Sequence, residues 1–243
     1  MKPAAVKSLI YKEFYMTRKP LLIQMITFAL VAVMGILIEV SFQIGNLALL
    51  SGSIKSELKE MADFGILIYP VFMAGIFTFT ISDASMKDED AAWKRFCYST
   101  PVSHKDFAIA KYTAFLMTII VESILSFAYV AVVCHILNFK FSKLYLAYIL
   151  AVIAVTTFMA IMNHVGILLF HSTDKAGLLM LAVLLSIVLI PVLINKNSGN
   201  VPITKEVMES TAMNLLPWLP GIIATALILG CLASAVLLKR REK

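Results

Sequence analysis

The sequence predicts an all-α polytopic membrane protein with six transmembrane helices, and three observations lead to this fold class. Of 243 residues, 60% are hydrophobic and 15% are charged. A soluble domain averages nearer half apolar and a quarter charged, so the excess must face lipid. The apolar residues fall into blocks near the ~20 residues with which a helix crosses ~30 Å of hydrocarbon. The period-two alternation of a membrane β-barrel is absent.

Six apolar blocks are long enough to be assigned as spans, and the second and fifth are the shortest. Helices are expected because lipid offers the backbone no hydrogen-bond partners. The whole chain, residues 1–243, should form a single transmembrane domain. The predicted spans are Pro20–Val40, Phe64–Ile81, Tyr112–Leu137, Leu144–Phe170, Gly177–Ile194 and Trp218–Leu238.

Positive charge is distributed unevenly around these spans. With the N-terminus inside, the cytoplasmic segments hold 15 of the 21 Lys and Arg residues, and the outer segments hold six. This is the bias that the positive-inside rule expects. We therefore expect a multi-pass protein of the plasma membrane with both termini in the cytoplasm. The net charge of +6 follows from this topology and does not indicate a nucleic-acid partner.

Residues 4–18 are predicted to form an amphipathic helix ahead of the first span. Val6, Leu9, Ile10 and Phe14 recur at helical spacing, with basic side chains on the other faces. This pattern is typical of a helix lying in the membrane surface. The alternative is an ordinary basic flank that sets the topology.

The longest cytoplasmic segment joins the second and third spans. Ser85 with Asp88, and Ser103 with Asp106, each fit a helix-capping box. The first box predicts a short amphipathic helix that carries Trp93, and the second predicts the start of the third span. The short helix either rests on lipid headgroups or docks a soluble partner.

Few polar side chains are expected within the spans. Glu122 lies inside the third span, where an acid costs at least ~2.5–3.5 kcal/mol. Ser123 and Ser126 are near enough in sequence to share its polar surroundings. Two interpretations stay open for Glu122, a residue of a substrate path or a structural hydrogen bond between helices. Asn163, in the fourth span, is a second candidate for a path.

Small residues recur every four positions in the last span, at Ala226, Gly230 and Ser234, which favours close packing of that helix. The three cysteines lie far apart and form no CxxC pair, so a disulfide framework is not expected. The histidines show no ligand spacing, and we predict no metal site.

Two stretches of the sequence resemble type-2 ABC exporter permeases. Tyr98-Ser-Thr-Pro-Val-Ser-His-Lys-Asp-Phe107, with Lys111-Tyr112 after it, is similar to a pattern of the compact bacterial branch. That pattern is an acidic stretch, a Tyr, Ser-Leu-Pro-[Val/Ile]-[Ser/Thr]-[Arg/Lys] and then Lys-Tyr. Leu9-Ile-Tyr-Lys-Glu-Phe14 resembles the Leu-x-x-Lys-[Asp/Glu]-[Leu/Phe] pattern of the elbow helix. Thr100 and His104 depart from the usual residues, which leaves the subfamily open.

The resemblance implies that residues 4–18 form an elbow helix and that residues 86–106 form a coupling segment. In the family this segment sits in a cleft of an ATPase subunit and passes its motion to the spans. The second and fifth helices line the dimer interface and path, which would suit a kink at Pro70. Carried over to this sequence, the ATPase-coupling contacts are Asp88, Glu89, Asp90, Trp93, Pro101, Val102, Ser103 and His104.

No Gly-x-x-x-x-Gly-Lys-[Ser/Thr] loop occurs in the sequence, so the chain is not expected to be an enzyme that hydrolyses ATP. We expect it to bind no cofactor directly, and ATP-Mg to be bound by a separate ATPase subunit. Six spans are half the usual set. The expected assembly is therefore two ATPase copies with two permease copies, as a homodimer or a heterodimer.

The expected function is export of amphipathic or hydrophobic peptides, such as toxins or antimicrobial peptides. The branch that the sequence resembles includes such exporters, among them those of phenol-soluble modulins. One alternative is a non-transporting membrane subunit for immunity or sensing. A second alternative is an intramembrane enzyme. It is disfavoured because Glu122 has no paired Glu and the acidic run Asp88-Glu89-Asp90 cannot present one helical face.

Overall fold

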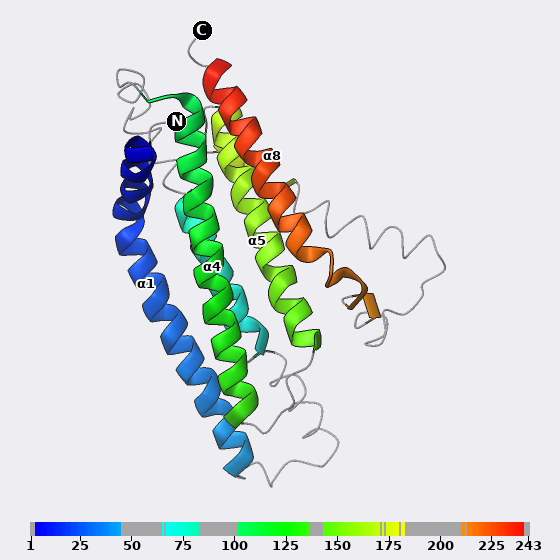
Figure 1. The fold of residues 1–243 in the computed structure, drawn as a ribbon. Coiled ribbons are helices and arrows are strands. Elements are labelled where there is room, and N and C mark those ends of the chain that lie inside the picture. The colour runs from blue at the N-terminus through cyan, green and yellow to red at the C-terminus, as the bar shows by residue number, and fades with distance from the viewer. Residues whose placement is uncertain are drawn as a thin grey trace.

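The protein is a bundle of long helices in the computed structural model. Four long helices lie side by side (Figure 1), namely α1 (Pro3–Ile44), α4 (His104–Ile136), α5 (Lys143–Phe170) and α8 (Leu219–Arg240). A shorter apolar helix, Leu67–Ser82, passes behind α4. No strand occurs in the residues that the structure describes. These are 3–44, 65, 67–82, 102–136, 143–170, 172, 174–179, 181–182, 210–211 and 213–240.

The four long helices are each long and apolar enough to cross a membrane. They correspond to the predicted first, third, fourth and sixth spans. The described helix at the second span has 16 residues, Leu67 to Ser82. Of the fifth span, most lies outside the described residues, although residues 174–179 are helical. The described part of the chain therefore shows four candidate spans and one shorter apolar helix.

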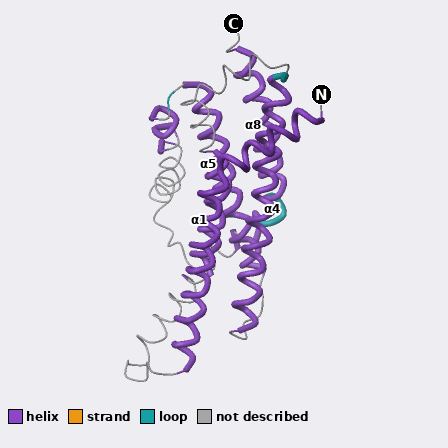
Figure 2. Tube along the Cα trace, turned by 90° about the vertical axis from the view of Figure 1, so that its left-hand side faces the viewer, coloured by secondary structure: helices purple, strands orange, loops and turns teal. Residues whose placement is uncertain are grey.

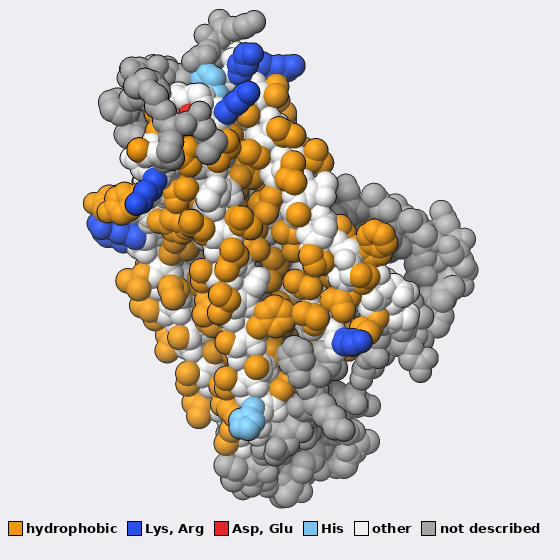
Figure 3. Space-filling model, viewed as in Figure 1, with side chains coloured by type: hydrophobic (Ala, Val, Ile, Leu, Met, Phe, Trp, Pro, Cys, Tyr) orange, Lys and Arg blue, Asp and Glu red, His pale blue; other side chains and the backbone are white. Residues whose placement is uncertain are grey.

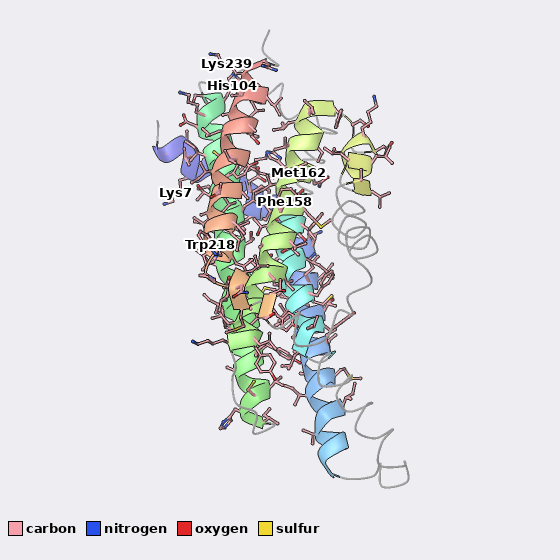
Figure 4. The ribbon with its side chains drawn as sticks, turned by 90° about the vertical axis from the view of Figure 1, so that its right-hand side faces the viewer. Lys7, His104, Phe158, Met162, Trp218 and Lys239 are labelled. Atoms are coloured by element: carbon pink, nitrogen blue, oxygen red, sulfur yellow. The ribbon has the colours of Figure 1, made fainter. Side chains whose placement is uncertain are left out.

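Helix α1 combines the predicted amphipathic segment and the first span in one continuous helix that includes Pro20. Its first turns run across the end of the bundle before the helix turns to run along it (Figures 2 and 4). Proline inside a helix removes one backbone hydrogen bond and bends the axis. Pro20 therefore accounts for a bend without a break in the helix.

Helix α4 is the centre of the bundle and packs against α1, α5 and α8. One core cluster lies along its second half, where Val130 and Val133 meet Phe28 of α1 and Ile149 of α5. A second core cluster lies nearer the start of α4. A third joins Phe107 and Ala108 to Leu168 of α5 and Leu238 of α8. The bundle is thus held along its whole length by apolar contacts that centre on α4.

The outer surface is apolar along the middle of the bundle, as the space-filling view shows (Figure 3). Leu22, Leu30 and Leu229 are each about 60% exposed on α1 and α8. Lysine and arginine gather at the end where α1 and α4 begin and α8 ends, whereas Lys143 lies at the other end. An apolar belt with basic residues gathered toward one end is the surface of a membrane protein.

Candidate functional site

Of the predicted coupling segment, the structure describes residues 102–106, where the segment enters α4. Asp88, Glu89, Asp90, Trp93 and Pro101 lie outside the described residues.

Ser103 starts α4 as a helix cap. The amide of Asp106 donates to Oγ of Ser103 at 3.1 Å, and the amide of Phe107 donates to its carbonyl at 3.1 Å. A serine in this position satisfies amides that a helix start leaves without partners. Val102 precedes the cap and His104 is the first helical residue. Figure 4 shows His104 and Lys239, at the end of α8, at the same end of the bundle.

A buried cation joins three helices close to this segment. Nζ of Lys111 donates to Oε2 of Glu13 at 2.6 Å and to the carbonyl oxygen of Ile81 at 2.7 Å. Lys111 is 1% exposed and Glu13 is 2% exposed, so water does not compete for these contacts. Charge-assisted hydrogen bonds of this length are the strong ones. We call this contact, formed by Glu13, Ile81 and Lys111, the Glu13–Lys111 junction.

The junction sits where apolar residues hold the surrounding helices. Phe107 and Phe115, one turn before and one turn after Lys111 on α4, are both buried, and the ammonium lies 5.8 Å from the Phe115 ring centre. Glu13 follows Val6 by two turns on the buried side of α1. An ion pair in such surroundings is compatible with a stable fold only when both charges keep their partners, because burying either charge alone lowers the stability strongly.

The Leu67–Ser82 helix is tied to its neighbours by polar contacts on several sides. Toward α1, the hydroxyl of Thr80 donates to Oε1 of Gln24 at 2.6 Å. Toward α5, Nδ2 of Asn163 donates to Oγ of Ser82 at 2.6 Å. Toward α4, the amide and hydroxyl of Thr78 donate to Oε1 of Glu122, the hydroxyl at 2.6 Å. Such contacts fix the register of the helix in an apolar setting.

The Leu67–Ser82 helix, α4, α5 and nearly all of α8 lie within a stretch that matches a known family, and α1 precedes that stretch. Residues 58–239 match the family described as ABC-2 family transporter protein, which is well over half of the chain. The chain belongs to the ABC-2 transporter family. No curated protein and no solved structure matches it. The match confirms the resemblance to type-2 ABC permeases, and the chain is therefore an ABC transporter permease embedded in the membrane by several helices.

The ABC-2 permease encloses the residues that the sequence suggested for a substrate path. Glu122 is 0% exposed and Asn163 is 4% exposed, and both are hydrogen-bonded to the Leu67–Ser82 helix. Pro70 is also buried, and the helix continues beyond it. Within this one chain, Glu122 and Asn163 act as contacts between helices.

The hydrogen-bond partner of Glu122 lies on another helix and is neither Ser123 nor Ser126. Ser123 donates instead to the carbonyl of Ile119 on its own helix at 2.7 Å, and the hydroxyl of Ser126 makes no hydrogen bond. Thr78, forty-four residues earlier in the chain, supplies both donors. Sequence proximity on α4 was therefore a poor guide, because the polar neighbour comes from the helix that packs against it.

Replacing Glu122 tests whether this contact is structural. We expect Glu122→Gln to keep the melting temperature near that of the wild type, because an amide oxygen still accepts from Thr78. Glu122→Leu should lower the free energy of unfolding by about 1–3 kcal/mol, since the buried hydroxyl of Thr78 loses its acceptor. Thermal unfolding in one detergent measures both, with Ser123→Ala as the control. An unchanged melting temperature for Glu122→Leu, together with altered ATPase stimulation, would instead favour a substrate path.

The start of α4 packs closely on α8 of the permease. The hydroxyls of Tyr112 and Ser234 lie 3.1 Å apart in a hydrogen bond, and Gly230 faces the Tyr112 ring one turn before Ser234. Ala226 packs against the core cluster that contains Tyr112. The four-residue spacing of small residues thus lies where α8 packs closely on its neighbours, as the sequence indicated.

The described residues contain no group of three or more His, Cys, Asp or Glu side chains placed to hold a metal ion. Cys134 and Cys231 are free. Among the described residues, Glu13 forms ion pairs with Lys111 at 2.6 Å and with Lys12 at 3.8 Å.

The residues that sequence reasoning missed are Glu13 and Thr78. A usable signal existed for Glu13, because it shares the inward side of an amphipathic helix with Val6 and Thr17. Lys111 likewise lies between Phe107 and Phe115 on the inward side of α4. Two opposite charges, each on an apolar helix face, are candidates to pair with each other. Thr78 gave no comparable signal.

Proposed function

We propose that this permease is the membrane subunit of an ATP-driven exporter whose ATP hydrolysis occurs on a separate chain. The observation that carries the proposal is the family match over residues 58–239. It is supported by the lack of a phosphate-binding loop in the sequence. The coupling contacts Asp88, Glu89, Asp90, Trp93 and Pro101–His104 would dock on the ATPase.

The direction of the helices supports six spans in this proposal. Helices α5 and α8 both end at the same end of the bundle, as the colour gradient of Figure 1 shows. The chain between Phe170 and Leu219 must therefore return to the opposite end. A single crossing by the predicted fifth span, Gly177–Ile194, satisfies this requirement. With Leu67–Ser82 as the second span, the total is six.

The proposed orientation places both termini in the cytoplasm. The first and last described helices have their outer ends at the same end of the bundle, where Lys and Arg gather. The positive-inside rule assigns that end to the cytoplasm. The first turns of α1, which run across this end, would then form the elbow helix at the membrane surface.

The proposed assembly has two permease copies, identical or different, and two ATPase copies, with ATP-Mg on the latter. The proposed cargo is an amphipathic or hydrophobic peptide, which two apolar permease copies would enclose between them. In this mechanism ATP binding draws the ATPases together, and the coupling segments pass that motion to the helices around the shared path.

Co-purification from the native host tests the proposal. We expect an ATPase with a phosphate-binding loop to purify with the tagged permease in a ratio near one to one, as measured by native mass spectrometry. Replacing Trp93 and Pro101 should remove it, whereas Trp218→Ala, an exposed Trp at the far end of α8, should not. A permease that purifies without any ATPase, under conditions that preserve other complexes, would contradict the proposal and favour an immunity or sensor role.

The cargo class has its own measurement. In nanodiscs, a synthetic amphipathic helical peptide should raise the ATPase rate of the complex, while a scrambled peptide of equal composition without an apolar face should not. Equal rates with both peptides would contradict peptide export and leave the ATP-driven permease in place.

A further inference from the structure

We propose that the Glu13–Lys111 junction is the joint through which movement of the coupling segment reaches the first turns of α1. Glu13 and Lys111 are thereby positioning residues for energy coupling. The inference rests on the proposed function, since it needs an ATPase that moves the segment. It goes further by naming the contact that carries the motion and the part of the permease that receives it.

The junction lies at both ends of the coupling segment at once. Ile81 belongs to the last described turn before the segment, and Lys111 lies two turns after the segment enters α4. The Lys111 ammonium binds the Ile81 carbonyl at 2.7 Å, so the helix before the segment and the helix after it are fastened to each other. A displacement of the segment therefore cannot separate these two helices here without breaking this contact. It moves both of them together.

The same ammonium passes this displacement to α1. Glu13 accepts from it at 2.6 Å, and Glu13 belongs to the turns of α1 that precede Pro20. On the outward side of those turns, Tyr11 is 70% exposed and Tyr15 is 51% exposed. The turns are therefore held on their inner side at the junction, and their outer side carries the exposed rings of Tyr11 and Tyr15. A pull on Lys111 would tilt them.

The ion pair supplies directional contact that the nearby apolar contacts do not. Leu9 packs against the cluster of Phe107, Ala108, Leu168 and Leu238. Apolar contacts of this kind are non-directional and tolerate sliding. Two short hydrogen bonds from one buried ammonium fix position and angle together. Removing the ion pair should thus leave the first turns of α1 in place by apolar packing while breaking their mechanical link to the segment.

The test uses the double variant Glu13→Gln/Lys111→Met in the purified complex with its ATPase, in nanodiscs. This variant removes both charges together, so neither is left buried without a partner, and the fold should be kept. The control is Tyr112→Phe/Ser234→Ala, which removes a buried polar contact between α4 and α8 near the same end. Hydrogen exchange is measured by mass spectrometry without nucleotide and after trapping with ATP and vanadate.

In the wild type and in the control, trapping should change exchange both in residues 83–101 and in residues 3–19. In the double variant the change in 83–101 should remain, and the change in 3–19 should be lost. The stimulation of ATPase activity by the peptide probe should be lost as well. A double variant whose residues 3–19 still respond as in the wild type would overturn the inference. A complex without any ATPase would instead overturn the proposed function, so the two failures are distinguishable.

Discussion

Lys111→Met is expected to lower the free energy of unfolding of the permease by roughly 3–5 kcal/mol, the usual cost of removing one partner of a buried ion pair. The Glu13 carboxylate is 2% exposed, and Lys111 is its close partner at 2.6 Å. Without the ammonium, the buried carboxylate keeps only the longer contact with Nζ of Lys12, 3.8 Å from Oε1 of Glu13, and the Ile81 carbonyl loses a donor. Thermal unfolding in detergent should show a clearly lower midpoint.

Two further variants make this expectation specific. Lys105→Met, an exposed lysine on the same helix, should change stability by no more than about 0.5 kcal/mol. Adding Glu13→Gln to Lys111→Met should restore most of the lost stability, because the unpaired charge is gone. If Lys111→Met unfolds at the temperature of the wild type, the ion pair contributes little, and packing around Phe107 and Phe115 holds the junction together.

Gly230→Ala is the second substitution with a large expected effect. A Cβ at Gly230 would lie 2.6 Å from Cγ2 of Ile161 and 2.7 Å from the hydroxyl oxygen of Tyr112, both far inside contact distance. The β-branched Ile161 has little rotational freedom, and Tyr112 is held by Ser234. Overpacking of this kind lowers the free energy of unfolding by about 1–3 kcal/mol. We expect α8 to move away from α4 and α5.

Gly221→Ala, in the same helix, is the matched control. A Cβ there meets nothing within 4 Å, so alanine should be neutral or stabilising through its better helix propensity, by up to about 1 kcal/mol. Thermal midpoints of the two variants in one detergent give the comparison. Similar midpoints for both would mean that α8 shifts to accommodate the methyl group at little cost.

Much of the fold followed from hydropathy and helix signals. The block predicted from Leu144 to Phe170 is α5 (Lys143–Phe170), and Ser103 begins α4 as its capping pattern predicted. The predicted third span begins at Tyr112, eight residues after the start of α4, because Asp106 and Lys111 interrupt the apolar pattern, although both are buried. Charged residues that have partners inside the bundle are not recognisable as such by hydropathy alone.

The candidate site was less predictable than the helices. The two family patterns contain Glu13 and Lys111 separately, yet nothing in their spacing shows that they meet, because 98 residues separate them. Likewise, Thr78 is one hydroxyl among several in the Leu67–Ser82 helix, and its contact with Glu122 depends on how two helices are rotated. Long-range pairing of this kind is decided by tertiary packing, and local patterns carry little information about it.

The contact between Thr78 and Glu122 also bears on how the chain enters the membrane during synthesis. Alone, α4 would bring a carboxyl into hydrocarbon, and the Leu67–Ser82 helix would bring Thr78, Thr80 and Ser82 with a short apolar length. As neighbouring helices they satisfy one another at Oε1 of Glu122. We therefore expect the two to partition from the translocon into lipid together, and the Leu67–Ser82 helix to leave the protein-conducting channel only after α4 has been made.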